Sequence, residues 1–326
     1  MMDKNSNKQN INSGKYPILF LEPVLQHKIW GGTRLITDFG YHSESSDIGE
    51  CWGIAAHPHG DVSIKGGRYD GEKLSDFWRK EPDFFGKYSN DRFPLLIKII
   101  DAKEDLSIQV HPDDSYARTK EQESFGKMEC WYILDCPEGA NLVIGHNATT
   151  KQQLVQMISD GKWDDLIRRI PVHKGDFIQI DAGTVHSITA GCLILETQQN
   201  SDITYRLYDY DRCPDGKRRE LHIDKSIDMI EAPAKSVANS VIKTETMPEN
   251  RWNLLVSCEY YNVYKMELTQ SFSFSHNESF LNMSVVEGAG TVEGIAVKKG
   301  DHFMIPAGYG NISMEGKMTI IASEAK

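Results

Sequence analysis

The chain has 326 residues and a formal net charge of −11, and 40% of its residues are hydrophobic and 25% charged. These fractions are typical of globular proteins, and the length allows one large domain or two medium ones. The acidic balance argues against a nucleic-acid partner, and because no run of 18 apolar residues occurs, no membrane span is expected.

The N-terminal residues and the cysteines indicate the compartment. Residues 1–14 form a polar tail that lacks the apolar core of a signal peptide. The six cysteines are scattered without a C-x-x-C pair, which favours reduced thiols over a disulfide framework. The sequence therefore predicts a cytoplasmic protein.

Short β-type segments dominate the chain after the tail. Gly, Pro, Asp and Asn residues separate them, a pattern that is typical of an all-β barrel or sandwich. In chain order the clearest segments cover residues 17–25, 93–100, 106–111, 130–135, 176–181, 192–197, 262–268, 283–288, 302–307 and 318–323.

Two stretches carry apolar residues at helical spacing instead. They lie at about 72–86 and 150–170, and the second repeats its apolar residues as Leu154 and Ile158, then Trp163 and Ile167. Thr150 is the predicted N-cap of the second stretch. We expect both to be helical insertions in a β scaffold.

The segment "LSIQVHPDD", residues 106–114, predicts a strand with an unusual polar face. Side chains alternate along a strand, so Leu106, Ile108 and Val110 share one face. Gln109 and His111 share the other face, just before a turn. An amide and an imidazole on one face can reach a single ion inside a barrel.

An internal repeat indicates two related units. Residues 175–186 read "GDFIQIDAGTVH" and residues 300–311 read "GDHFMIPAGYGN". Both contain Gly-Asp, four residues, a turn-former with Ala, and Gly. His186 ends the first copy and Asn311 the second, so the first unit is predicted to be active and the second to have lost its site. The polar region 231–251 separates them, which gives units of 15–240 and 241–326.

Four donor side chains lie in or beside the β-type segments of the first unit. Two imidazoles, a carboxylate and an amide oxygen suit a borderline divalent cation such as zinc, with water or substrate completing the sphere. The four are Gln109, His111, Glu129 and His186. A second pair, His57 and His59, lies among Pro and Gly, and there a surface loop is the favoured interpretation.

The spacing of these donors resembles the cupin pattern, in which one motif supplies a ligand pair and an acid and a second reads Gly-Asp…Gly-x-x-His. Within the cupins, four longer stretches resemble the shorter bacterial class of type I phosphomannose isomerases. They are "FPLLIKIIDAKEDLSIQVHPDD", "GKMECWYIL", "GTVHSI" and "LETQQNSDITYRLYDYDR". The resemblance covers the chain from residue 21 to the C-terminus. It implies two jelly-roll units and a zinc-dependent interconversion of mannose 6-phosphate and fructose 6-phosphate.

The resemblance also implies roles for individual residues. Gln109, His111, Glu129 and His186 become ligands of one zinc per chain. Arg206, Lys127 and Glu196 become catalytic residues, with Arg206 either stabilising an enediolate or anchoring the phosphate and one of the other two shuttling the proton. Lys98 and Asp202 become contacts to the phosphosugar. The stretch "HSITAG" departs from the longer family members, which have a tyrosine soon after the last histidine.

Two rival interpretations stay open from the sequence. One is a cupin pair that binds a sugar or regulates a partner without turnover. The other is an oxygen-using iron enzyme on the same scaffold, although such sites are usually richer in histidine. The sequence does not indicate the oligomeric state.

Overall fold

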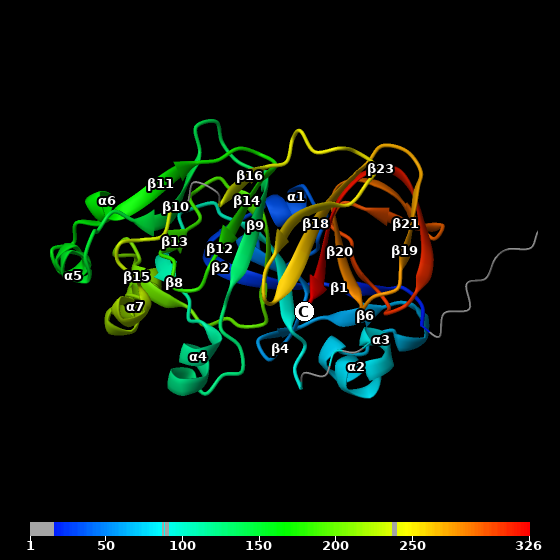
Figure 1. Ribbon diagram of the computed structural model, residues 1–326, viewed down its shortest axis with the longest axis horizontal. Coiled ribbons are helices and arrows are strands. Elements are labelled where there is room, and N and C mark those ends of the chain that lie inside the picture. The colour runs from blue at the N-terminus through cyan, green and yellow to red at the C-terminus, as the bar shows by residue number, and fades with distance from the viewer. Residues whose placement is uncertain (1–15, 87, 89–90, 237–239) are drawn as a thin grey trace, which may run out of the picture.

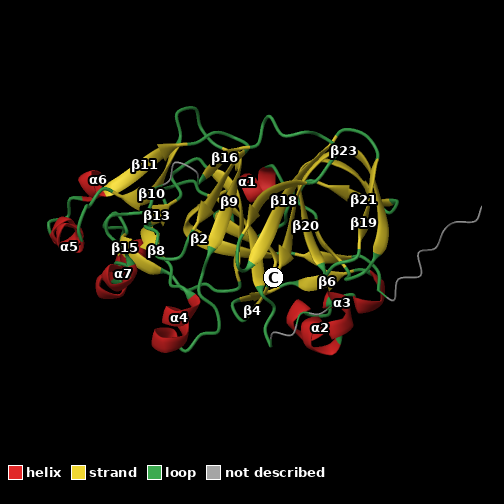
Figure 2. Ribbon diagram, in the orientation of Figure 1, coloured by secondary structure: helices red, strands yellow, loops and turns green. Residues whose placement is uncertain are grey.

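The computed structural model describes residues 16–86, 88, 91–236 and 240–326. The predicted polar tail, 1–14, lies outside the described residues. Figure 1 shows two β units side by side, the first built mainly from residues up to about 240 and the second from the C-terminal residues. Most of the helices lie at the periphery of the two units, as the colouring of Figure 2 shows.

The first unit is a sandwich of two antiparallel sheets. Apolar side chains from both, including Trp131, Ile178 and Ile144, pack together between them. Within the described residues, one sheet has seven strands in the order β16 (Val241–Lys243), β12 (Asp176–Ile180), β9 (Glu129–Asp135), β14 (Leu193–Gln199), β7 (Leu95–Asp101), β3 (Ile48–Ile54) and β2 (Val24–Gly32). The other has five, in the order β11 (Ile167–Pro171), β10 (Asn141–His146), β13 (His186–Ser187), β8 (Ile108–Val110) and β15 (Tyr205–Tyr208).

Helices cover the outer face of the five-stranded sheet. Ile108 and Val110 of β8 form an apolar cluster with Leu154 and Leu166 from the helical insertion. Thr150 caps that insertion as predicted, since its side chain accepts a hydrogen bond from the backbone N–H of Gln153. The prediction of a helix as far as residue 170 is wrong at its end, because Ile167–Pro171 pair with β10 as strand β11. Because the helices bury the apolar face of β8, the polar face can turn into the sandwich.

The helices themselves are short. They are α1 (Arg34–Thr37), α2 (Leu74–Lys80), α3 (Pro82–Phe85), α4 (Asp114–Tyr116), α5 (Lys151–Ser159), α6 (Trp163–Leu166) and α7 (Ile223–Met229). Gly67–Tyr69 and Pro214–Gly216 form 3₁₀ turns, and Ala117–Glu121 forms a π-helical turn. In the part of the chain that the structure describes, none is long and apolar enough to cross a bilayer.

The sheet of the second unit includes two strands from the N-terminal part of the chain. Among the described residues its sheet runs β17 (Asn253–Ser257), β18 (Tyr261–Leu268), β23 (Gly310–Ala325), β20 (Leu281–Val292), β22 (His302–Ile305), β1 (Leu19–Glu22) and β6 (Ser63–Lys65), and β19 (Phe272–His276) and β21 (Ile295–Lys298) pair with β23 and β20. A boundary between residues 240 and 241 stays a prediction, but the sheets do not divide there.

An aromatic core joins the two units. Trp78 and Phe85 of the α2–α3 insertion pack against Phe280 of the second unit, and Phe77 packs behind them against Phe85. Tyr261 of β18 belongs to the same cluster and is fully buried. The fold is therefore all-β with inserted helices, as predicted, and the second unit supports the first through a continuous apolar interface.

Gly53 marks a close approach between the units and gives a stability prediction. A Cβ atom at Gly53 of β3 would lie 2.4 Å from the ring of His302 in β22. That ring cannot move aside, because Ser284 Oγ and Tyr41 OH hold its nitrogens at 2.8 and 3.1 Å. We expect Gly53→Ala to lower the free energy of unfolding in urea by about 1–3 kcal/mol through overpacking.

A double mutant supplies the control for this prediction. In a His302→Ala background the added methyl group has room, so Gly53→Ala should then cost much less. An equal cost in both backgrounds would show that the contact with His302 is not the cause.

Candidate active site

Four predicted donor side chains meet inside the first unit. Gln109 lies in β8, and His186 opens β13 directly opposite it in the sheet register. Glu129 opens β9 on the facing sheet, and His111 follows the end of β8. The five-stranded sheet thus brings Gln109 and His186, 77 positions apart, together, and the facing sheet adds Glu129 to the same buried cluster.

Glu129 is the centre of the cluster. Its Oε2 lies 3.5 Å from His111 Nε2, and its Oε1 lies 3.3 Å from His186 Nε2. All three side chains are only 1% exposed. Neither carboxylate oxygen has a hydrogen-bond partner of regular geometry among the described residues, and burial raises the pKa of Glu129. A buried carboxylate without such partners is costly, and a cation between these atoms would remove the cost.

The backbone fixes the tautomers of both histidines. His111 Nδ1 lies 2.8 Å from the carbonyl of Ile203, and His186 Nδ1 lies 2.8 Å from the carbonyl of Thr184. A carbonyl only accepts, so each Nδ1 carries the proton and each Nε2 presents a lone pair to Glu129. Burial lowers the pKa of both rings, that of His186 to about 4, so both are neutral. Metal-binding histidines are oriented in this way.

Gln109 is close enough to complete the donor set. Its amide nitrogen lies 3.4 Å from His186 Nε2, and its oxygen faces Ser107 Oγ at 3.5 Å. A half-turn of the amide exchanges the two atoms and directs the oxygen at the cluster. The oxygen is the ligand atom that the sequence predicts.

Lys127 brings a positive charge into the same space. Its Nζ lies 3.1 Å from His111 Nε2 and 3.3 Å from Glu129 Oε2, and the residue is 5% exposed. The prediction that placed this lysine beside the donors therefore agrees with its position.

A second polar row crosses the seven-stranded sheet beside the cluster. Strand pairing aligns Lys98 with Glu196 and Glu196 with Trp131. Lys98 Nζ lies 2.9 Å from Glu196 Oε1, and Trp131 Nε1 donates to Glu196 Oε2 at 2.8 Å. Lys98 is also 3.7 Å from Glu50, a residue that the sequence analysis did not single out.

These contacts set the charge states in the row. The carboxylates of Glu196 and Glu50 raise the pKa of Lys98 against the effect of burial, so the lysine stays charged. Lys98 and its neighbour Lys28 lower the pKa of Glu50 to about 2. The alternation in "GECWGI", which puts Glu50 and Trp52 on one strand face, was the signal that could have identified Glu50.

Arg206 lies beside the donors on the next strand. In β15 it is paired with Gln109 of β8, so both side chains belong to the same face of the five-stranded sheet. Its Nε is buried and has no hydrogen-bond partner among the described residues. Burial and the nearby Arg219 lower the pKa of Arg206. A guanidinium held without a regular partner is suited to an incoming anion.

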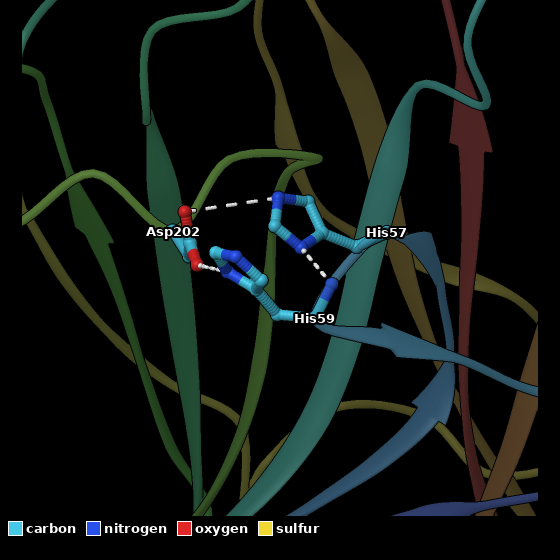
Figure 3. Close-up of side chains that lie close together, drawn as sticks. All are labelled: His57, His59 and Asp202. Carbon is cyan, nitrogen blue, oxygen red and sulfur yellow. Dashed lines mark hydrogen bonds and ion pairs between the residues drawn. The ribbon is translucent and has the colours of Figure 1, made fainter.

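Asp202 lies apart from this cluster, against the two histidines of residues 57–59. Figure 3 shows His57, His59 and Asp202 facing one another. The interpretation of residues 57–59 as a surface loop is right for His59, whose side chain is 71% exposed, and wrong for His57, which is 6% exposed. His57 lies in β4 (Ala56–His57), which forms a small hairpin with β5 (Gly60–Asp61), and its ring packs against the ring of the buried Trp52 at 5.7 Å between centroids.

Known proteins resemble the chain over almost its whole length. Models described as "Phosphomannose isomerase type I, catalytic domain" and "Mannose-6-phosphate isomerase, cupin domain" match residues 18–134 and 252–325. The chain is 48% identical to mannose-6-phosphate isomerase ManA of Bacillus subtilis (strain 168) over 310 residues, 94% of this chain and 98% of the relative. It is 42% identical to the mannose-6-phosphate isomerase of Streptococcus mutans over 312 residues, which cover 94% of this chain and 98% of the relative.

Solved structures resemble the fold equally broadly. The crystal structure of the mannose 6-phosphate isomerase from Bacillus subtilis matches with a TM-score of 0.88 and 42% identity, over 94% of this chain and 99% of that chain. A mannose 6-phosphate isomerase bound with zinc and yttrium matches with a TM-score of 0.77 at 15% identity, over 95% of this chain and 99% of that chain. The prediction of a cupin-type all-β fold is therefore confirmed, with open jelly-roll sheets rather than closed barrels.

Proposed function

Because this chain belongs to the type I phosphomannose isomerases, we propose that it interconverts mannose 6-phosphate and fructose 6-phosphate at the cluster around Glu129. The observation that carries the proposal is the buried arrangement of His111, Glu129 and His186 with Lys127 beside it. Six free cysteines agree with the cytoplasmic location that we propose.

The donor set fits one zinc ion per chain. Two neutral imidazoles and a carboxylate whose atoms lie within 4.8 Å of one another are a typical zinc environment, and the Gln109 oxygen can join them. When bound, the metal would supply a Lewis acid that polarises the sugar oxygens. Gln109, His111, Glu129 and His186 would hold it.

The protein's own groups would perform the proton transfer. An aldose becomes a ketose when one proton moves from C2 to C1 and a second moves from O2 to O1, and the costly species is an enediolate. Lys127 and Glu196 are the candidates for the shuttle, since both are buried beside the donors and able to exchange a proton. Trp131 and Lys98 hold the Glu196 carboxylate in place from two sides.

Cations in the pocket would balance the charge of the substrate. Arg206 would either stabilise the enediolate oxygen or anchor the 6-phosphate. Lys98 and Asp202 were predicted to contact the sugar phosphate, and that remains a prediction. The alternative is a non-catalytic sugar-binding protein. That alternative does not explain why Lys127 is buried beside the donor set.

A coupled assay for fructose 6-phosphate tests the proposal. Protein would be assayed as purified, after chelation, and after zinc is returned, with mannose 6-phosphate as substrate. We expect turnover to disappear with the chelator and to return with zinc. Absence of turnover in protein that holds one zinc per chain would refute the isomerase, and turnover that survives complete metal removal would refute the metal requirement. Turnover in the absence of oxygen would exclude the oxygen-using iron enzyme.

A further inference from the structure

A three-residue cluster lies outside the donor set described above. His59 Nδ1 is 2.5 Å from Asp202 Oδ2, and His57 Nε2 is 3.7 Å from Asp202 Oδ1. The histidines belong to the β4–β5 hairpin, and Asp202 belongs to the connection between β14 and β15 (Figure 3). Two imidazoles and a carboxylate invite interpretation as a second metal site.

The tautomer of His57 argues against that interpretation. The backbone N–H of His59 donates to His57 Nδ1 at 3.2 Å, so Nδ1 carries the lone pair and the proton of the neutral ring is on Nε2. Nε2 is the atom that faces Asp202, and it offers a proton rather than a lone pair. His111 and His186 have the opposite arrangement, with Nδ1 protonated against a carbonyl. The cluster is therefore a clamp in which His59 Nδ1 hydrogen-bonds to Asp202, while His57 Nε2 lies outside hydrogen-bond range of the same carboxylate.

The clamp holds a connection that reaches the donor set. Asn200 is buried, and its amide donates to the carbonyls of Ala56 and Phe93 at 3.1 and 2.7 Å. Asp202 follows with its contacts to the hairpin, and the next residue is Ile203. The carbonyl of Ile203 is the acceptor that fixes the His111 ring. One short segment, residues 200–203, is thus tied to the β4–β5 hairpin on one side and to His111 on the other.

We propose that Asp202 and His59 are positioning residues, whose hydrogen bond holds residues 200–203 so that the Ile203 carbonyl keeps the His111 ring in the Nδ1-protonated form with Nε2 directed at Glu129. Asp202 acts through the backbone in this proposal and need not touch the substrate. The effect on zinc rests on the proposed function, whereas the effect on the His111 ring does not.

The test is ¹⁵N NMR of the histidine rings in metal-free protein, combined with zinc affinity from competition with a chromophoric chelator. In Asp202→Ala we expect the His111 ring to lose its single Nδ1-protonated form. We expect zinc to bind about tenfold more weakly, the lower end of what loss of an orienting partner costs. Asp202→Asn keeps an oxygen acceptor for His59 Nδ1–H and should restore both values.

His59→Ala is the companion variant. It removes the hydrogen-bond partner of the Asp202 carboxylate and leaves the donor set itself unchanged. We expect the same change in the His111 tautomer and in zinc affinity as in Asp202→Ala. An unchanged His111 tautomer and unchanged zinc affinity in Asp202→Ala would overturn the proposal. So would a second equivalent of zinc that the parent protein binds and Asp202→Ala loses, since the cluster would then be a metal site. The NMR measurement does not depend on isomerase activity. A protein without isomerase activity could therefore still show the expected change in the His111 tautomer, so failure of the proposed function and failure of the positioning proposal can be told apart.

Discussion

Replacing Glu129 by glutamine is expected to remove zinc from the protein and to lower turnover by at least about 10²-fold. Glu129 lies between His111 Nε2 and His186 Nε2, and it is the one anionic group of the proposed donor set. Glutamine keeps the shape and one carbonyl oxygen but loses the charge. The loss in zinc affinity should exceed the roughly 10- to 100-fold that changes to outer-shell partners cost. Metal analysis after dialysis and the coupled assay at saturating zinc measure the two effects.

Asp176 provides the control for Glu129. Its carboxylate is equally buried, but it lies on β12 and pairs with Lys243 at 2.6 Å and with the backbone N–H of His173. Asp176→Asn therefore removes a buried negative charge away from the donors. We expect Asp176→Asn to lose stability and keep its zinc. If Glu129→Gln retained full zinc and turnover, Glu129 would not be a ligand.

Local sequence rules were sufficient for the strand that carries Gln109. The alternation in residues 106–111 predicts which side chains share a face, and the amphipathic stretch near 150–170 predicts the helices that cover the other face. Both features depend on neighbours within a few residues. The structure shows them together, with Ile108 and Val110 buried under α5 and α6 and Gln109 inside.

Orientation within the site depends on contacts that no local pattern contains. The His111 ring is fixed by a carbonyl 92 positions away, and the burial of His57 depends on the packing of a two-residue hairpin. Glycine and proline around residues 57–59 indicate a turn, but they do not indicate what covers it. The interpretation of His57 as a surface residue failed for this reason.

Charge pairing across strands had the same limitation. Lys98 was selected as a substrate contact by resemblance alone, and the sheet register places Glu196 and Glu50 next to its ammonium group. The crossing of β1 and β6 into the second unit is also a matter of long-range pairing. The sequence predicted strands such as β7, β8 and β9 but not β3, β10 or β15, and the register decided which charges meet.

Replacing Arg206 by alanine is the second change with a large expected effect. Arg206 is not among the proposed ligands, so zinc should remain bound at one per chain. Turnover should fall by about 10²- to 10³-fold if the guanidinium stabilises charge in the transition state, as for the loss of one oxyanion donor. Steady-state kinetics separate the two roles left open for this residue. A fall in kcat indicates stabilisation of the enediolate, and a rise in KM at constant kcat indicates an anchor for the phosphate.

Arg212 is the control, since it is bound to Asp209 and to the carbonyl of Asp105 and should be replaceable without loss of turnover. Near-normal kinetics in Arg206→Ala would exclude both roles for Arg206.

The stability of Arg206→Ala provides a separate test. Arg206 Nε is buried without a hydrogen-bond partner among the described residues, so its removal relieves a desolvation cost. We expect Arg206→Ala to resist urea as well as the parent protein or better. Lower turnover with undiminished stability is the combination expected when a side chain is kept for an anion that arrives with the substrate.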